Sequence, residues 1–185
     1  DCSLISDGGA AFILTSAEHA KELGIRKPIY ILGGGECYTH EHIFLMPSLT
    51  VTGAVESSRL AYEMAGYRAS DMDVAGVYDC FTGTVIMMLE DLGFCAKGEG
   101  GGFVADGNLI SGVGRLPFNT DGGGLCNNHP ANRGGMTKVI EAVRQLRGDA
   151  HPKVQVKNCD LAIAHGTGGS LGSRHGSATV ILERE

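Results

Sequence analysis

Three short polar clusters in this chain carry side chains suited to acid–base chemistry. The first is Tyr-Asp-Cys-Phe-Thr at residues 78–82, the second ends in Asn128, His129 and Pro130, and the third begins at His165. Imidazole exchanges protons near neutral pH, so His129 and His165 are candidates for a general acid and a general base. We expect the clusters to converge on one pocket.

The second cluster has a setting that favours chemistry. A glycine-rich loop leads into His129, Pro130 fixes the backbone beside it, and an amphipathic helix is predicted directly afterwards. The dipole of that helix would favour the neutral imidazole, which can accept a proton. The alternative is a histidine that only holds the loop. For Asp79, in the first cluster, the alternative to a ligand-binding role is a helix cap.

The third cluster continues as Gly166, Thr167, Gly168 and Gly169. Consecutive backbone N–H groups in a glycine-rich loop can form a concavity that binds an oxyanion. The segment lacks the Lys-Ser/Thr pair of a phosphate-binding loop, so the glycines alone are a weak signal. The histidine at the mouth of the loop strengthens the interpretation.

The elements that must position these clusters follow from apolar spacing and from glycine stops. We predict strands at 10–14, 29–32, 74–78, 161–164 and 178–182, and helices at 17–23, 56–64, 84–92 and 136–146. Residues 98–128 are predicted to be mostly loop. Strands that alternate with helices of about ten residues indicate a layered α/β domain with a largely buried sheet, in which the last two strands are neighbours.

Composition excludes several classes of protein. With a net charge of −6 and scattered basic residues, a broad nucleic-acid surface is not expected. No apolar run approaches the 18 or so residues of a membrane span, and no signal peptide is visible, so we expect a cytoplasmic protein. The six separated cysteines are interpreted as reduced thiols. A metal at His40 and His42 is weighed and set aside. Four basic residues are candidates to meet an anionic ligand: Arg133, Lys138, Arg174 and His175.

The order and separation of the clusters resemble the carboxy-terminal half of the thiolase superfamily. Residues 78–81 stand where that family has Asn-Glu-Ala-Phe, 128–130 where it has Gly-His-Pro, and 165–168 where it has Cys-x-Gly. The match is closer to the sterol-carrier, lipid-transfer branch, which is acetyl-CoA acetyltransferase-like. The resemblance implies the second half of a five-layer αβαβα fold, so residues 1–185 are interpreted as a thiolase C-terminal domain and as a fragment. The half that bears the nucleophilic cysteine would be absent.

The resemblance also implies roles for individual residues. His129 would activate the cysteine of the other half, and His165 would replace a proton-abstracting cysteine. Tyr78 would border the oxyanion site, with Asp79, Asn128 and the segment 166–169 binding the oxyanion or substrate.

A coenzyme A thioester is the expected substrate, with no tightly bound cofactor and no metal. Expected partners are the N-terminal half, a second copy in a homodimer or higher oligomer, and a small zinc-ribbon/OB-fold protein. Two alternatives to a thiolase-like acyltransferase or C–C bond lyase stay open. They are a retro-aldolase of steroid-type hydroxyacyl side chains and a non-catalytic binding module for lipid or acyl-CoA.

Overall fold

A four-stranded mixed sheet forms the centre of the domain. The computed structural model describes residues 1–130, 134–168 and 176–185. The strands are β1 (Ile29–Tyr38), β2 (Val74–Val77), β3 (Leu161–Gly168) and β4 (Gly176–Arg184), in the order β1-β4-β3-β2. β2 runs parallel to β3, whereas β4 is antiparallel to both of its neighbours. The last two strands are therefore neighbours, as predicted.

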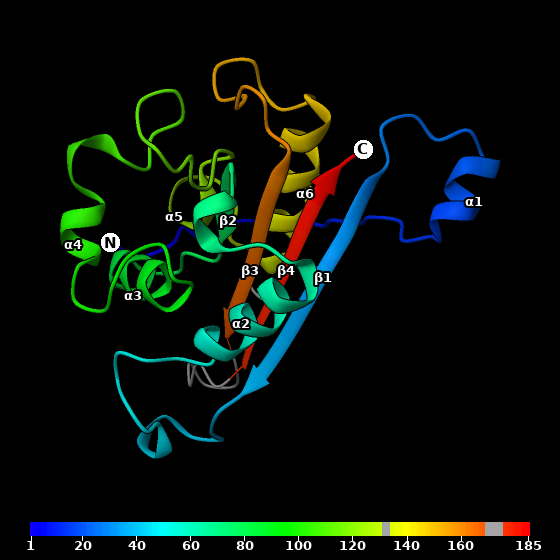
Figure 1. Cartoon of the computed structure of the whole chain (residues 1–185). Coiled ribbons are helices and arrows are strands. Elements are labelled where there is room, and N and C mark those ends of the chain that lie inside the picture. Colours follow the sequence, from blue (N-terminus) through cyan, green and yellow to red (C-terminus); the bar gives the residue numbers. More distant parts are fainter. Residues whose placement is uncertain (131–133, 169–175) are drawn as a thin grey trace.

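Helices cover both faces of this sheet (Figure 1). On one face, α2 (Ala54–Ala65) and α3 (Thr82–Asp91) pack with the strand residues Val77, Ile163 and Ile181 in one apolar cluster. On the other face, α6 (Gly134–Arg147) packs with the alternate strand residues, among them Ala162 and Ala164. Alternation along buried strands thus supplies a core to each helix layer. The layered α/β class expected from the sequence is confirmed.

The remaining helices are short. They are α1 (Ala17–Glu22), α4 (Gly100–Phe103) and α5 (Gly123–Cys126), with single 3₁₀ turns at Ile43–Leu45, Ala69–Asp71 and Ala105–Gly107. The side chain of Ser16 caps α1, as predicted. In the described part of the chain, no helix has both the length and the apolar character needed to cross a membrane.

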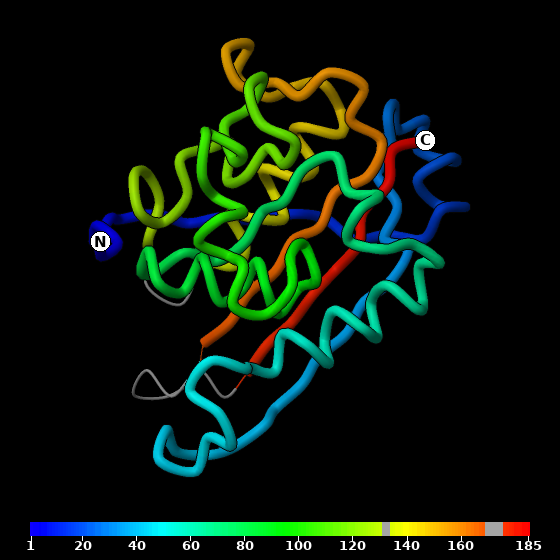
Figure 2. The backbone as a smooth tube through the Cα atoms, turned by 60° about the vertical axis from the view of Figure 1, so that its left-hand side comes forward, coloured from blue at the N-terminus to red at the C-terminus, as the bar shows by residue number. Residues whose placement is uncertain are grey.

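The strand expected at 10–14 is wrong. Residues 3–16 form neither helix nor strand, and Ile13 is 94% exposed. Figure 2 shows this segment crossing the molecule from the N-terminus towards α1. An apolar run becomes a strand only where another strand offers backbone partners, and no strand of the described sheet pairs with this one.

Three other strands are longer than predicted, and β4 extends beyond the expected 178–182 at both ends. β1 continues through three glycines to Tyr38, and β3 continues through His165 to Gly168. The expectation that residues 165–168 form a loop is therefore wrong. These residues pair with residues 176–179 of β4 instead.

The glycines of β1 let α2 approach the sheet closely. A Cβ at Gly35 would lie 2.1 Å from the carbonyl oxygen of Ser57, whereas a Cβ at Gly34 would meet nothing closer than 3.8 Å. We expect Gly35→Ala to lower the free energy of unfolding by about 1–3 kcal/mol, because the backbone of α2 must move away. Gly34→Ala is the matched control and should stay within about 1 kcal/mol of the parent. Urea denaturation followed by circular dichroism measures both, and equal stabilities would contradict this packing.

Candidate functional site

Tyr78 and His129 form a hydrogen-bonded pair. The Tyr78 Oη lies 2.6 Å from His129 Nε2, and the rings are tilted by 37° with their centroids 5.4 Å apart. Burial, with smaller contributions from the Cys80 and Asp79 charges, raises the pKa of Tyr78 to about 12. At neutral pH the phenol therefore keeps its proton. This arrangement places a weak acid and an imidazole base in direct contact.

The local fold explains how the two rings meet. Tyr78 directly follows β2, and its backbone N–H donates to the carbonyl oxygen of His165 on the parallel neighbour. Its ring then lies over the start of α6, where a Cβ at Gly134 would be only 2.8 Å from Cε2. His129 lies on the segment just before the same helix. The end of β2 therefore meets the segment that leads into α6, and this brings the two rings together.

The backbone of His129 is held by the N-terminal segment. The His129 N–H donates to Ser6 Oγ at 2.8 Å, and the Ser6 N–H donates back to the His129 carbonyl oxygen at 3.4 Å. Sequence reasoning missed Ser6, because no motif or periodicity links two residues so far apart in the chain.

Asp79 faces the protein's own backbone. Its carboxylate is buried and accepts hydrogen bonds from the N–H groups of Gly124, at 2.7 Å, and Leu125, at 3.2 Å. Asp79 therefore caps a helix, as the alternative to a ligand-binding role expects, but that helix is α5. The helix that follows Asp79 in the chain is α3, whose N-cap residue Phe81 makes no side-chain hydrogen bond. This carboxylate is already occupied by internal donors.

Asn128 fastens the loop to its surroundings. Its Nδ2 donates to Asp121 Oδ2 at 2.5 Å, and its Oδ1 accepts from Thr137 Oγ1, on α6, at 2.9 Å. The side chain next to His129 is therefore fixed at both ends.

His165 lies elsewhere. Its side chain is 1% exposed, and Nδ1 is 2.8 Å from Thr179 Oγ1, which in turn bonds Ser57 on α2. It faces the α2 side of the sheet, as Ile163 does two residues earlier, while Tyr78 and His129 lie towards α6. The structure does not bring the two imidazoles together, so the expected single pocket with a histidine on each side is not found.

The rest of the third cluster is strand backbone. Gly166 faces the start of α6, where a Cβ would lie 3.8 Å from Gly135, and Thr167 Oγ1 donates to the Gly176 carbonyl oxygen. Gly168 ends β3, and Gly169 lies outside the described residues. A loop of free N–H groups at 166–168 is excluded because these residues pair with β4.

Comparison with known proteins agrees with this fold. The thiolase C-terminal domain-like family matches residues 35–184. The chain belongs to this family.

Its relatives include an acetyltransferase and an aldolase. The chain is 36% identical to the acetyl-CoA acetyltransferase of Methanothermobacter thermautotrophicus, covering 94% of this chain and 45% of that protein. It is 41% identical to the steroid side-chain-cleaving aldolase of Thermomonospora curvata, covering 80% and 38%. It is also 34% identical to rabbit (Oryctolagus cuniculus) sterol carrier protein 2, covering 98% and 33%, so it belongs to the sterol-carrier branch.

A solved structure named Ltp2-ChsH2(DUF35) aldolase matches with a TM-score of 0.72 and 32% identity, over 85% of this chain and 40% of that one. The thiolase-like domain thus spans less than half of each of these proteins.

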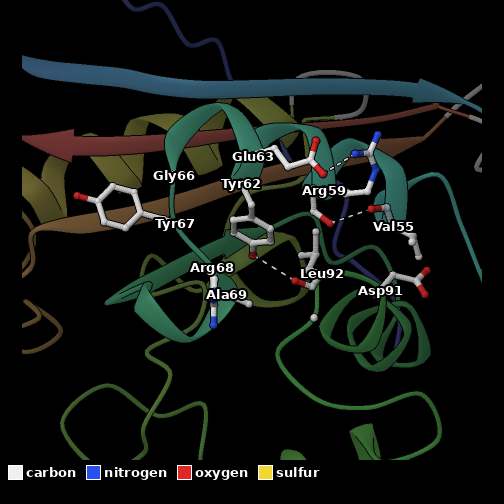
Figure 3. A pocket seen from close by; sticks show the side chains of 12 residues that line it. Val55, Arg59, Tyr62, Glu63, Gly66, Tyr67, Arg68, Ala69, Asp91 and Leu92 are labelled. Carbon is white, nitrogen blue, oxygen red and sulfur yellow. Dashed lines mark hydrogen bonds and ion pairs between the residues drawn. The ribbon is translucent and has the colours of Figure 1, made fainter.

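In this thiolase-like domain, a cavity of about 510 Å³ lies apart from the Tyr78–His129 pair. It opens between α2 and the end of α3 (Figure 3). Arg59 at its rim is bound by Glu56 and Glu63, and Tyr62 Oη donates to the Leu92 carbonyl oxygen. Arg59 and Tyr62 are thus bound internally, and the cavity adds no residue to the Tyr78–His129 pair.

Other sequence candidates contribute little to this thiolase-like site. Within the described ranges, no group of three or more His, Cys, Asp or Glu side chains could hold a metal, and this includes His40 and His42. All six cysteines have described positions and are free thiols. Of the four basic candidates for an anionic ligand, Arg133, Arg174 and His175 lie outside the described residues. Lys138 is buried between two carboxylates.

The contact between Tyr78 and Gly134 can be tested directly. Gly134→Ala should push the phenol ring away from His129, because the new methyl group would lie within 2.8 Å of Cε2. Gly135→Ala is the control, since nothing lies within 4 Å of a Cβ there. The ¹⁵N resonance of His129 Nε2 reports the hydrogen bond. It should move in the first variant only, and an unchanged resonance in both would refute the described ring position.

Burial of His165 makes a separate prediction for stability. Desolvation lowers the pKa of His165 from its usual 6.5 to about 3. Between these values the unfolded chain binds a proton that the folded chain does not, so stability falls as the pH drops from 6.5 to 3. His165→Asn, which can still bond Thr179, should remove this loss, worth up to about 1.4 kcal/mol per pH unit. Parallel pH–stability curves for parent and variant would show that His165 is accessible to protons.

Proposed function

We propose that this chain is the C-terminal part of a thiolase-like enzyme that breaks or forms a C–C bond next to an acyl-CoA thioester. The observation that carries the proposal is the 2.6 Å hydrogen bond between Tyr78 Oη and His129 Nε2. Acyltransferase and aldolase relatives both support this reaction class. Either reaction needs a proton to move to or from the substrate as the C–C bond changes.

In the thiolase reading, His129 takes the proton of a cysteine thiol that another part of the enzyme supplies. The thiolate then attacks the β-carbonyl carbon of a β-ketoacyl-CoA, and the α-carbon leaves as the enolate of a shorter thioester, which takes the proton from His129. The acyl group stays on the cysteine as a thioester until the thiol of free coenzyme A takes it and the cysteine thiol is restored. His129 suits this role in the tautomer that leaves Nε2 unprotonated, in which Nε2 can accept from the Tyr78 phenol. In this reading Tyr78 holds the imidazole in that tautomer.

In the retro-aldolase reading, Tyr78 itself meets the substrate. Once His129 has taken the phenol proton, the phenolate oxygen can remove the proton of a β-hydroxyl group. The C–C bond then breaks into a carbonyl product and a thioester enolate, which is protonated at the α-carbon. The direct Tyr78–His129 contact favours this second candidate, and the aldolase relatives support it. No tightly bound cofactor is needed in either reading.

His165 enters neither reaction in this proposal. It is buried on the other face of the sheet, and its low pKa keeps the imidazole neutral. Its carbonyl oxygen, which accepts from the Tyr78 N–H, is its contribution to the site. Asp79 and Asn128 likewise act by holding the loops.

The partners in the proposal are acyl-CoA and the N-terminal thiolase half. Several apolar side chains of the N-terminal segment are available for that half, because Ile5 is 97% and Leu14 is 68% exposed. Dimerisation, a zinc-ribbon/OB-fold partner and a cytoplasmic location also stay proposals. If the whole protein binds acyl-CoA but turns nothing over, the remaining proposal is a non-catalytic binding module.

The test compares site variants of the whole enzyme that contains this chain. Tyr78→Phe and His129→Ala should each lower kcat by about 10²–10⁴-fold, because the proton-transfer pair is lost. Circular dichroism should stay unchanged, since His129 lies in a loop. Tyr30→Phe, on β1, is the control and should keep full activity.

The assay offers acetoacetyl-CoA for thiolysis and a β-hydroxyacyl-CoA for retro-aldol cleavage, with products separated by chromatography. A cysteine in the N-terminal half that is essential for turnover favours the thiolase, whereas cleavage of only the hydroxyacyl substrate favours the aldolase. Retention of most of the turnover by either site variant would remove the Tyr78–His129 pair from the mechanism.

A further inference from the structure

A buried lysine lies directly behind the Tyr78–His129 pair. Lys138 is on α6, its side chain is 1% exposed, and its ammonium is 3.5 Å from Asp79 Oδ1 and 3.8 Å from Asp121 Oδ1. No atom with a described position makes a well-directed hydrogen bond to Nζ. The ammonium therefore acts through its charge, shared between two carboxylates.

Each of these carboxylates holds one of the two site segments. Asp79 is the residue after Tyr78 and receives the N–H groups of the loop that leads to His129. Asp121 lies on that loop, where it accepts from the Gly123 N–H at 3.0 Å and from Asn128 Nδ2. Lys138 is thus the common contact between the segment of Tyr78, the loop of His129 and the helix beneath them.

The burial of these charges makes the three side chains depend on one another. A buried carboxylate without a counter-charge is costly, and so is a buried ammonium, so loss of either leaves the others uncompensated. The cluster is close to the imidazole, since Asp79 Oδ1 and His129 Cδ2 both lie 3.2 Å from the point where a Gly124 Cβ would sit. Glu141, one turn further along α6, is bound to Thr120 and Gln145 and is not part of the cluster.

We propose that Lys138 is a positioning residue: its ammonium draws Asp79 and Asp121 together and so sets the distance between Tyr78 and His129. This inference rests on the proposed function of that pair. It goes further because Lys138 lies outside the three motifs and yet controls the distance between Tyr78 and His129. Lys138 does not touch the substrate in this proposal.

The first variant is Lys138→Met in the whole enzyme, which keeps the length of the side chain and removes the charge. Lys157→Met is the control, because Lys157 is exposed and outside the site. We expect kcat to fall at least tenfold in the first variant, KM to change less than twofold, and the control to match the parent. The acidic limb of the kcat/KM profile should move to higher pH, since two uncompensated carboxylates favour protonated imidazole.

A second variant tests the proposal even if Lys138→Met fails to fold. Asp121→Asn removes one carboxylate but keeps an oxygen for the Gly123 N–H, and the acidic limb should then move to lower pH. Asp121→Asn combined with Lys138→Met returns the net charge of the cluster to that of the parent and should recover part of the lost kcat. A purely structural lysine would lower thermal stability without moving either pH limb, and that result would overturn the proposal.

The ¹⁵N resonance of His129 Nε2 separates this inference from the proposed function. It should change in Lys138→Met even if Tyr78→Phe proves to be fully active, because it reports ring contact and needs no turnover. An unchanged resonance in Lys138→Met, together with unchanged kcat, would show that Lys138 does not position His129.

Discussion

Close packing of α6 on β2 is the constraint on which the site depends. A Cβ at Gly76 would lie 3.1 Å from the carbonyl oxygen of Lys138, so a larger residue there would move the helix and the strand apart by a few tenths of an ångström. The strand ends one residue after Gly76, and Tyr78 then reaches over the first turn of α6. A wider separation would move the phenol away from the segment that carries the imidazole. The chemistry proposed for the pair therefore follows from the geometry of the sheet.

Local signals explain which elements the sequence could predict. The helix that begins after Ser16 and the helix that ends at Gly66 were predicted because capping residues and glycine stops act on their own neighbours. The strand expected at 10–14 failed because an extended run needs a partner, which local sequence does not contain. β3 was predicted too short for a related reason, since its glycines suggested a loop but pairing with β4 keeps them extended.

The residues of the site also fall into those that local sequence can predict and those that depend on distant partners. The motifs at Tyr78 and His129 could be recognised by residue type and order, and the fold does bring them together. His165 was expected beside them in a loop, but β3 continues four residues beyond the predicted end, and alternation along the strand turns the His165 side chain to the α2 face, as for Ile163. Ser6 was not assigned to the site from sequence, and Lys138 was expected to meet an anionic ligand where it instead lies between two carboxylates of the chain, since such contacts join distant segments and depend on three-dimensional distance alone.

The N-terminal segment contacts both loops that carry the pair. The Asp1 carbonyl oxygen accepts from the Thr82 N–H, Ser3 donates to the Cys80 carbonyl oxygen, and Ser6 brackets His129. These bonds tie the N-terminal segment to the backbone on both sides of the site. Pulling on the amino end would be transmitted through three backbone contacts to the two loops that hold the reacting groups.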